Sequence, residues 1–230
     1  MCIKGSFYDY GTGDSLIDPK NYPVEIKQYL RQEEFALRQL SGDFDVLVEI
    51  GCMDGRYLEW SLAHGKKYLG VDIVSRYVTE GKRRLKKYGL SEPDYQIEIC
   101  SAENIGQFFK GKGSNNGGQM LLLCPFNSFG NMKDPKAVIS SLGLVDQTFL
   151  ICSYGTDDRS NAVRLNYYRS CGYRQIRLER SSEGVRFISE EGLDTIAYHP
   201  RYVLIMCRRQ GIKVRVEISG GIGVFYRRVI

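Results

Sequence analysis

Five short apolar runs that alternate with helical segments constrain the fold of this chain more than any other feature. The runs lie at residues 46–50, 68–73, 95–100, 119–124 and 148–153. Helical periodicity follows at residues 57–63, 75–88, 103–110 and 134–143. Continuous apolar strands between helices are typical of a parallel sheet covered on both faces, and right-handed crossovers then produce a doubly wound α/β topology.

The segments that flank this alternation predict two additions to the sheet. An amphipathic helix at 22–40, entered through Pro23, predicts an N-terminal helical cap over residues 1–42. After Tyr154, a helical segment at 161–170 and β-rich residues 175–198, with a turn at 181–184, predict an α+β insertion over residues 157–199. A helix at 200–210 and a hairpin of strands 212–218 and 223–230, turning at 219–221, complete a single domain of residues 1–230.

The composition narrows the class of protein. The chain has 230 residues, of which 43% are hydrophobic and 26% are charged, as in an ordinary globular domain. The longest purely apolar run near its middle, Met120–Cys124, is too short to span a bilayer, and the first residues lack the apolar core of a signal peptide. We therefore expect a cytoplasmic protein with no membrane partner.

Metal and nucleic-acid sites are also disfavoured by the sequence. Two histidines and seven scattered cysteines, none in a CxxC pair, indicate buried thiols in a reducing compartment and no metal site. The net charge is +5, and the densest basic run, residues 82–87, falls within a predicted helix. This run is expected to be a solvated helix face, so a nucleic-acid partner is not expected.

A glycine-containing turn follows the first predicted strand. Its sequence runs from Glu49 through Gly51 to Gly55, and Asp72 ends the second predicted strand about twenty residues later. Such a turn lets a ligand approach the backbone, and the acidic residue then reaches a ribose hydroxyl pair. The nicotinamide fingerprint GxGxxG would require glycines where Met53 and Arg56 stand. The alternative is a purely structural turn, with Asp72 capping the next helix.

These residues resemble the class I methyltransferases, which use S-adenosyl-L-methionine. Glu49, Gly51 and Gly55 match the first motif of the family, although Met53 stands where the middle glycine usually does. Asp72 matches the acidic residue that binds the ribose, and Ser101 stands where the adenine-binding segment usually has aspartate. The resemblance covers residues 43–153, and residues 200–230 in outline. It implies a mainly parallel seven-stranded sheet with its last strand antiparallel.

The resemblance implies the site residues as well. The expected cofactor-binding residues are Glu49, Gly51, Cys52, Met53, Gly55, Asp72, Ile73, Ser101, Ala102, Glu103 and Pro125. The segment after the fourth strand falls where the family's fourth motif lies beside the reacting methyl group, and the insertion resembles the substrate lids of small-molecule methyltransferases. The expected substrate-binding residues are Phe126, Asn127, Ser128, Phe129, Tyr10, Tyr168 and Tyr198.

Catalytic residues are harder to assign, because methyl transfer mainly requires that the reacting atoms be held in line. The two candidates are Asn127, for polar contact, and His199, as a general base near neutral pH. The alternatives are that Asn127 stabilises a turn, that His199 faces solvent, and that the candidate aromatic residues belong to the core.

Several functions remain open at this point. The leading hypothesis is a methyltransferase that acts on an N or O nucleophile of a small molecule, such as a secondary metabolite, and a homodimer is compatible with it. A second is an RNA or protein methyltransferase, although no dense basic face or recognition module is evident. A third is a non-catalytic, methyltransferase-like binding subunit that has lost the cofactor. A nicotinamide oxidoreductase is disfavoured by the glycine spacing.

Overall fold

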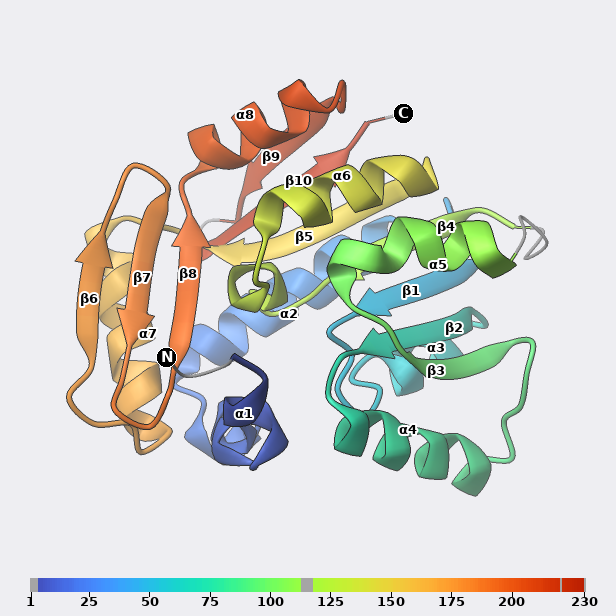
Figure 1. Ribbon diagram of the computed structural model, residues 1–230, viewed down its shortest axis with the longest axis horizontal. Helices are drawn as coiled ribbons and strands as arrows, with labels where there is room; N and C mark the ends of the chain where they lie inside the picture. The colour runs from blue at the N-terminus through green and yellow to red at the C-terminus, as the bar shows by residue number, and fades with distance from the viewer. Residues whose placement is uncertain (1–3, 113–117, 220, 230) are drawn as a thin grey trace.

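A computed structural model describes residues 4–112, 118–219 and 221–229. The main sheet contains seven strands in the order β3-β2-β1-β4-β5-β10-β9 (Figure 1). Their bounds are β1 (Val46–Ile50), β2 (Lys67–Asp72), β3 (Tyr95–Ile99), β4 (Met120–Cys124), β5 (Thr148–Tyr154), β9 (Val214–Ile218) and β10 (Gly223–Arg228). The first five strands pair in parallel, and β10 is antiparallel to both β5 and β9. The predicted doubly wound sheet with an antiparallel last strand is therefore confirmed.

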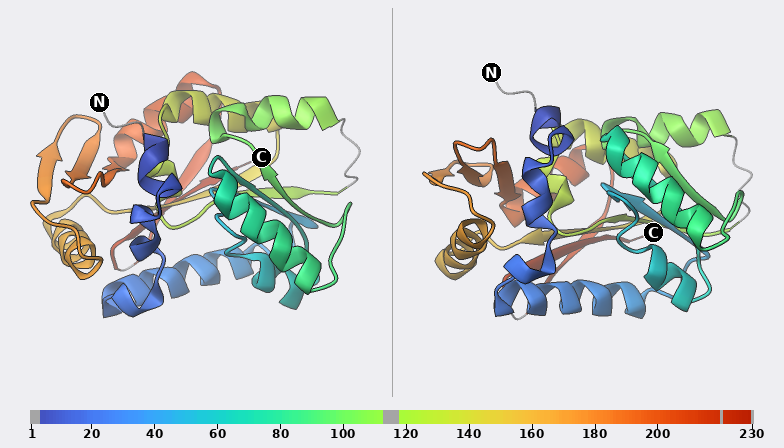
Figure 2. Two further views of the ribbon diagram at one scale, coloured as in Figure 1. Left: turned by 60° about the horizontal axis from the view of Figure 1, so that its bottom comes forward. Right: turned by 90° about the horizontal axis from the view of Figure 1, so that it is seen from below.

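Strands β1, β2, β4 and β5 are buried on both faces, which is why their apolar runs are continuous, whereas the edge strand β3 is only partly buried. Successive residues of a strand point to opposite faces, so Leu47 joins the core on one side of the sheet while Val46 and Val48 join the core on the other. The first side is covered by α2 (Val24–Gln39), α3 (Leu58–Ala63) and α4 (Ser75–Lys87). The second is covered by α5 (Ile105–Lys112), α6 (Pro135–Val145) and α8 (Pro200–Arg209). Figure 2 shows α2 and α6 in separate layers with the sheet between them.

The segment between β5 and α8 forms a small unit of its own. It consists of α7 (Asp158–Ser170) and an antiparallel sheet of β6 (Arg177–Arg180), β7 (Gly184–Ile188) and β8 (Asp194–Tyr198). Helix α7 begins three residues before the predicted start, because the Asp157 side chain caps it by accepting from the backbone N–H of Ser160 at 2.9 Å. Figure 1 shows the unit at the carboxyl ends of the parallel strands.

The insertion packs closely on the loop that follows β4. Gly130 belongs to η4 (Ser128–Asn131), and a Cβ atom at this position would lie 1.9 Å from the carbonyl oxygen of Ile196 on β8. Only glycine allows this approach of two backbones. The insertion is therefore seated on the same loop that carries the predicted substrate residues.

The first residues of the chain cross the carboxyl edge of the sheet. They include α1 (Lys4–Asp9) and η1 (Thr12–Leu16), and η2 (Pro19–Asn21) leads on to α2. We call residues 4–16 the N-terminal strap. Both views in Figure 2 place the strap between α4 and α7.

The strap is tied at both sides. Arg76 of α4 donates to the backbone carbonyl of Tyr8 at 2.9 Å and pairs with the Asp14 carboxylate at 2.5 Å. On the other side, Ser15 donates to the hydroxyl of Tyr173, just after α7, at 2.9 Å, and the Tyr167 hydroxyl donates to the carbonyl of Leu16. The strap therefore links the main sheet to the insertion.

No helix among the described residues is long and apolar enough to cross a membrane.

In the closing hairpin, the predicted strands at 212–218 and 223–230 are observed as β9 and β10. The predicted turn at 219–221 includes residue 220, and residues 220 and 230 lie outside the part of the chain that the structure describes.

Candidate active site

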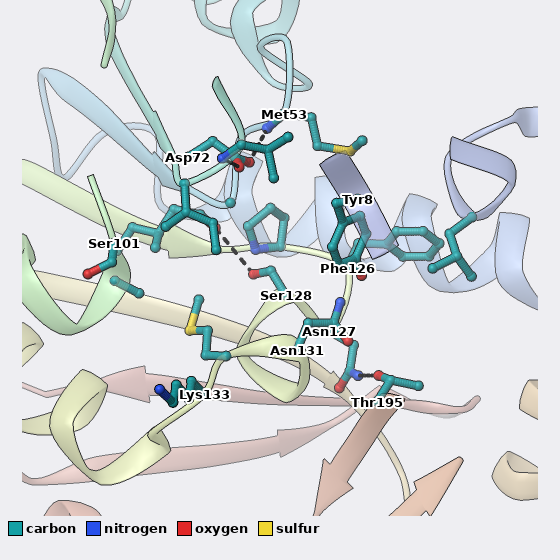
Figure 3. A pocket seen from close by; sticks show the side chains of 18 of the residues that line it. Tyr8, Met53, Asp72, Ser101, Phe126, Asn127, Ser128, Asn131, Lys133 and Thr195 are labelled. Carbon is teal, nitrogen blue, oxygen red and sulfur yellow. Dashed lines mark hydrogen bonds between the residues drawn. The ribbon is translucent and has the colours of Figure 1, made fainter. Parts of the chain in front are cut away.

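A cavity of about 1330 Å³ lies at the carboxyl edge of the sheet, beneath the strap and beside the insertion. Its walls come from the turn after β1, the ends of β2 and β3, the loop after β4, the strap and the insertion. In Figure 3, Asp72 and Met53 lie at one end of the view and Thr195 at the other, with Ser128 and Phe126 between them. A pocket for one ligand usually measures about 300–1000 Å³, so this cavity has room for a cofactor and a substrate together.

The turn after β1 brings the backbone to the wall of the cavity. Gly51 has a φ of 77°, and a Cβ atom there would lie 3.1 Å from the Cβ atom of Ser128. Met53 also has a positive φ, of 55°, which is the conformation that the glycine usual at this position would adopt without strain. The backbone requirement of the motif is therefore kept although the side chain is methionine. Gly51 and Met53 both line the cavity.

Asp72 is held in place by two backbone groups. Its carboxylate accepts from the N–H of Met53 at 2.8 Å and from the N–H of Val74 at 2.9 Å. The side chain is 7% exposed and lines the cavity. Burial raises the pKa of this carboxyl above its ordinary value, and the backbone N–H groups act against that shift. The hydrogen bond from the Met53 N–H connects the end of β2 directly to the glycine turn.

The segments that follow β3 and β4 complete this half of the cavity. Ser101, Ala102 and Glu103 line it after β3, beside Ile73 after β2. Pro125 lines it after β4, and the Ser128 hydroxyl donates to the carbonyl of Ile50 at 3.2 Å. The structure therefore brings eight of the eleven expected cofactor residues to the cavity: Gly51, Met53, Asp72, Ile73, Ser101, Ala102, Glu103 and Pro125.

The other three expected cofactor residues support the turn from behind and do not line the cavity. Glu49 is fully buried and accepts from the Tyr57 N–H at 3.0 Å and from the Tyr68 hydroxyl at 2.5 Å. Burial raises the pKa of Glu49 to about 8, against the lowering effect of the hydrogen bonds from these two groups. Cys52 is fully buried. Gly55 has a φ of 94°, and a Cβ atom there would lie 3.2 Å from Ile97.

The expected substrate residues divide in the same way. Phe126, Asn127, Ser128 and Tyr168 line the cavity. Phe129 is in the core against Tyr198, at a ring separation of 5.3 Å, and Tyr198 borders a second hollow next to the cavity. Tyr10 is 85% exposed on the outside of the strap, and Tyr8 lines the cavity instead.

The two catalytic candidates have protein partners. The Asn127 amide nitrogen donates to the Thr195 hydroxyl and the Ile196 carbonyl, both at 3.2 Å, and its oxygen accepts from Ser153 at 2.7 Å. Asn127 therefore joins β5, the β4 loop and the insertion. His199 does not line the cavity, because its ring lies between the Thr156 hydroxyl, at 2.8 Å, and the Ser181 carbonyl, at 3.3 Å.

Sequence reasoning missed several charged residues of the site. Arg56, next to Gly55, lines the cavity with its guanidinium 4.4 Å from the centre of the Phe126 ring. Burial opposes its charge, but Glu33 and nearby groups outweigh burial and raise the pKa of Arg56. Glu33 is fully buried and accepts from the Phe126 N–H at 2.6 Å and from the Tyr57 hydroxyl at 2.6 Å. The sequence does contain a signal for Glu33: it lies on the apolar stripe of α2, four residues before Leu37, where a charged side chain is expected to be buried.

The wall on the insertion side combines aromatic rings with one ion pair. Tyr154 of β5 and Tyr167 and Tyr168 of α7 line this wall. Arg186 and Asp194 also line it, and they form a two-pronged pair with both N···O distances at 2.6 Å. Among the described residues, no group of three metal-ligating side chains is placed to hold a metal ion.

Comparisons with known proteins give structural matches only. No family model matches the chain, and a search of the curated proteins finds no match. The magnesium protoporphyrin IX methyltransferase from Synechocystis PCC 6803, solved with bound SAH, is 11% identical. It superposes with a TM-score of 0.63, covering 98% of this chain and 97% of its own.

Two further structures are also similar, with lower TM-scores. An S-adenosylmethionine-dependent methyltransferase from Clostridium acetobutylicum is 12% identical and has a TM-score of 0.59, covering 88% of this chain and 92% of its own. The 1,6-didemethyltoxoflavin-N1-methyltransferase from Burkholderia thailandensis is 11% identical and has a TM-score of 0.55, covering 99% of this chain and 90% of its own. The chain therefore has the Rossmann-like fold of the class I methyltransferases.

Proposed function

We propose that this protein is an S-adenosyl-L-methionine-dependent methyltransferase that acts on an N or O nucleophile of a small molecule. The observation that carries the proposal is the convergence of four segments, in the family's order, on one cavity. These are the turn at Gly51 and Met53, Asp72, the segment at Ser101, and the loop at Pro125.

The residues present fit the proposed cofactor. The cradle at Gly51, which a Cβ atom would fill, suits a ligand that lies against the backbone. Asp72 would hold the ribose hydroxyls, and Ile73 and Ala102 would enclose the adenine, with Ser101 beside its amine. Arg56 would pair with the carboxylate of the methionine part. When bound, the cofactor supplies a methyl group on a positively charged sulfur atom.

The remaining residues of the cavity would position the substrate. Phe126, Tyr154 and Tyr168 offer apolar surfaces against which it can be oriented, and the strap and the insertion would act as a lid that excludes water. Asn127 would contribute by fixing this wall, since its amide already bonds to Ser153, Thr195 and Ile196. We assign His199 to the start of α8 and not to the reaction.

A small molecule is supported over RNA by the walls that the strap and the insertion add to the cavity, and by the surface charge. The basic run of residues 82–87 lies on α4, where Lys82 pairs with Glu98, Arg83 with Glu80 and Arg84 with Asp54. Three of the five basic side chains in this run are balanced in this way, which weakens the attraction of the run for phosphate. The six cysteines within the described residues are free thiols, which supports the proposed cytoplasmic location. A homodimer stays a prediction.

Thermal shift with S-adenosylmethionine, S-adenosylhomocysteine and NAD tests the proposal. A ligand that binds only the folded state raises the melting temperature, so the two adenosyl compounds should stabilise the protein and NAD should not. Stabilisation by neither adenosyl compound would contradict the proposal and favour the non-catalytic alternative. The nucleophile is then identified by incubating the stabilised protein with metabolite pools and with RNA, and by detecting which receives a methyl group.

A further inference from the structure

Arg164 of α7 is a fully buried arginine without a carboxylate partner. It is 0% exposed, and it forms no salt bridge within the part of the chain that the structure describes. Its Nη1 donates to the carbonyl of Val185 at 3.2 Å and its Nε to the hydroxyl of Tyr168 at 3.4 Å, while Nη2 has no hydrogen-bond partner. Buried charges are normally paired, so this one calls for an explanation.

Aromatic rings lie close to the guanidinium. Its central carbon lies 4.6 Å from the centre of the Phe187 ring and 5.4 Å from that of Tyr154. Such contacts attract a cation, but they leave its net charge in place. A positive charge therefore remains inside the insertion, directly behind two residues, Tyr154 and Tyr168, that line the cavity.

Tyr168 connects Arg164 to the cavity. Because the oxygen of its hydroxyl accepts from Arg164, the proton of that hydroxyl is free to point elsewhere. The Tyr154 hydroxyl makes no hydrogen bond to a described residue, although buried tyrosines usually find a partner. Two donors are thus available at the wall in front of the buried charge. The cation exposed on the same wall, Arg186, is already neutralised by Asp194.

We propose that the substrate is a planar aromatic molecule carrying an oxyanion, and that this oxyanion binds at Tyr168 and Tyr154 in front of Arg164. The inference rests on the proposed function, because it concerns the substrate half of the same cavity. Arg164 is then a positioning residue: it directs the hydroxyl of Tyr168 and supplies the charge that the oxyanion balances. The aromatic rings of Phe126 and Tyr167 supply the apolar surface for the ring system.

The test compares two probes of the same shape, 2-naphthoate and its neutral counterpart 2-naphthamide. Binding is measured by titration calorimetry on the full chain saturated with S-adenosylhomocysteine. We expect the carboxylate to bind about tenfold more tightly than the amide. Arg164→Met should reduce that ratio to about twofold or less. Arg169→Met, which removes an exposed charge from the same helix, should leave the ratio unchanged.

A second variant and a stability measurement separate a ligand role from a structural one. Replacing a buried unpaired charge with an apolar side chain of similar length is expected to leave the melting temperature unchanged or to raise it. If Arg164→Met does not fold, Tyr168→Phe gives the same test, since it removes the donor and should lower the ratio at least about threefold. Equal affinity of the wild type for both probes, no affinity for the carboxylate, or a ratio that survives Arg164→Met and Tyr168→Phe overturns the inference. Failure to bind S-adenosylhomocysteine would instead refute the proposed function.

Discussion

Asp72 is the residue on which cofactor binding should depend most directly. The proposed ribose hydroxyls would lose a charged acceptor in Asp72→Asn, while the backbone bonds to Met53 and Val74 could be partly kept. We expect the affinity for S-adenosylhomocysteine to fall by about 1–3 kcal/mol, the usual effect of weakening a buried polar contact. Titration calorimetry measures it. The control is Asp94→Asn, at an exposed pair with Lys67, and an unchanged dissociation constant in Asp72→Asn would refute the assignment.

The burial of Glu49 is expected to make the stability of the protein depend on pH. Its pKa is raised to about 8 in the folded protein from an ordinary value of 4.5. Between these values the folded state holds a proton that the unfolded state has released, so the free energy of unfolding falls as the pH rises. Glu49→Gln lacks this dependence, and its stability relative to wild type should therefore increase from about pH 5 to about pH 8. Urea unfolding at several pH values measures the difference, and parallel pH profiles would contradict it.

Residues of the site could be predicted where the local sequence alone determines their role. A turn that needs positive φ at Gly51, and an acidic residue at the end of the next strand, are readable because neighbouring parallel strands end at the same edge. Arg56 and Glu33 were not readable in this way. Their roles depend on which segments lie against them, and a lone charged residue in a helical pattern usually faces solvent.

The strap is expected to depend on Arg76. This side chain holds both the Tyr8 carbonyl and the Asp14 carboxylate. Because both side chains are partly exposed, these bonds together contribute on the order of 1–2 kcal/mol. Arg76→Ala should therefore increase hydrogen exchange in residues 8–16 about tenfold or more. It should also speed the dissociation of S-adenosylhomocysteine. Arg83→Ala, at an exposed pair on the same helix, is the control, and exchange equal to that of wild type would argue that the strap is held by its contacts with the insertion.

Gly130 tests how firmly the insertion is seated. Alanine there would place its Cβ atom 1.9 Å from the Ile196 carbonyl oxygen, so one of the two backbones would have to move. Gly130→Ala should lower the free energy of unfolding by about 1–3 kcal/mol, a typical effect of overpacking. Gly42→Ala, which meets nothing within 4 Å, should have little effect. Equal stability of the two variants would show that the backbones at Gly130 and Ile196 can move apart at little energetic cost.

At the level of elements, periodicity was a reliable guide. All five predicted runs became strands. Four of them, β1, β2, β4 and β5, are buried on both faces and show little polar alternation, whereas the edge strand β3 is only partly buried. The position of the strap could not be predicted from local periodicity. Residues 4–16 form short helical segments whose position depends on Arg76 and Tyr167, and no local pattern encodes contacts with partners so distant in sequence. The aromatic residue that reaches the cavity is accordingly Tyr8 and not Tyr10.

The charge of the whole molecule predicts weak binding to nucleic acid. The net charge is +5, but three of the five basic residues in the densest basic run form ion pairs with acidic side chains. Fluorescence anisotropy with a labelled RNA of about 20 nucleotides should show no saturation at about 150 mM salt. Tight binding under these conditions would favour the RNA methyltransferase alternative. The variant Lys86→Glu, at the end of the same run, would then show whether α4 is the binding surface.

The topology of the sheet could be predicted from the sequence, but the position of the insertion at the cavity could not. Alternating strands and helices determine a doubly wound sheet because few topologies satisfy the handedness and packing rules. The insertion was predicted as an α+β unit over residues 157–199, but its seating on Gly130 was not. That contact depends on the backbone of β8, whose position no sequence pattern of residues 128–131 reveals.

The hydrogen bonds that fasten the strap to the insertion join residues 151, 158 and 161 positions apart. During synthesis, the strap therefore leaves the ribosome long before α7 exists, while β1 to β5 can already assemble beside it. The edge of the sheet that is proposed to bind the cofactor can form first, and the cavity walls that the insertion supplies are completed last. A nascent chain released early would consequently present this edge without the cavity walls that the insertion supplies.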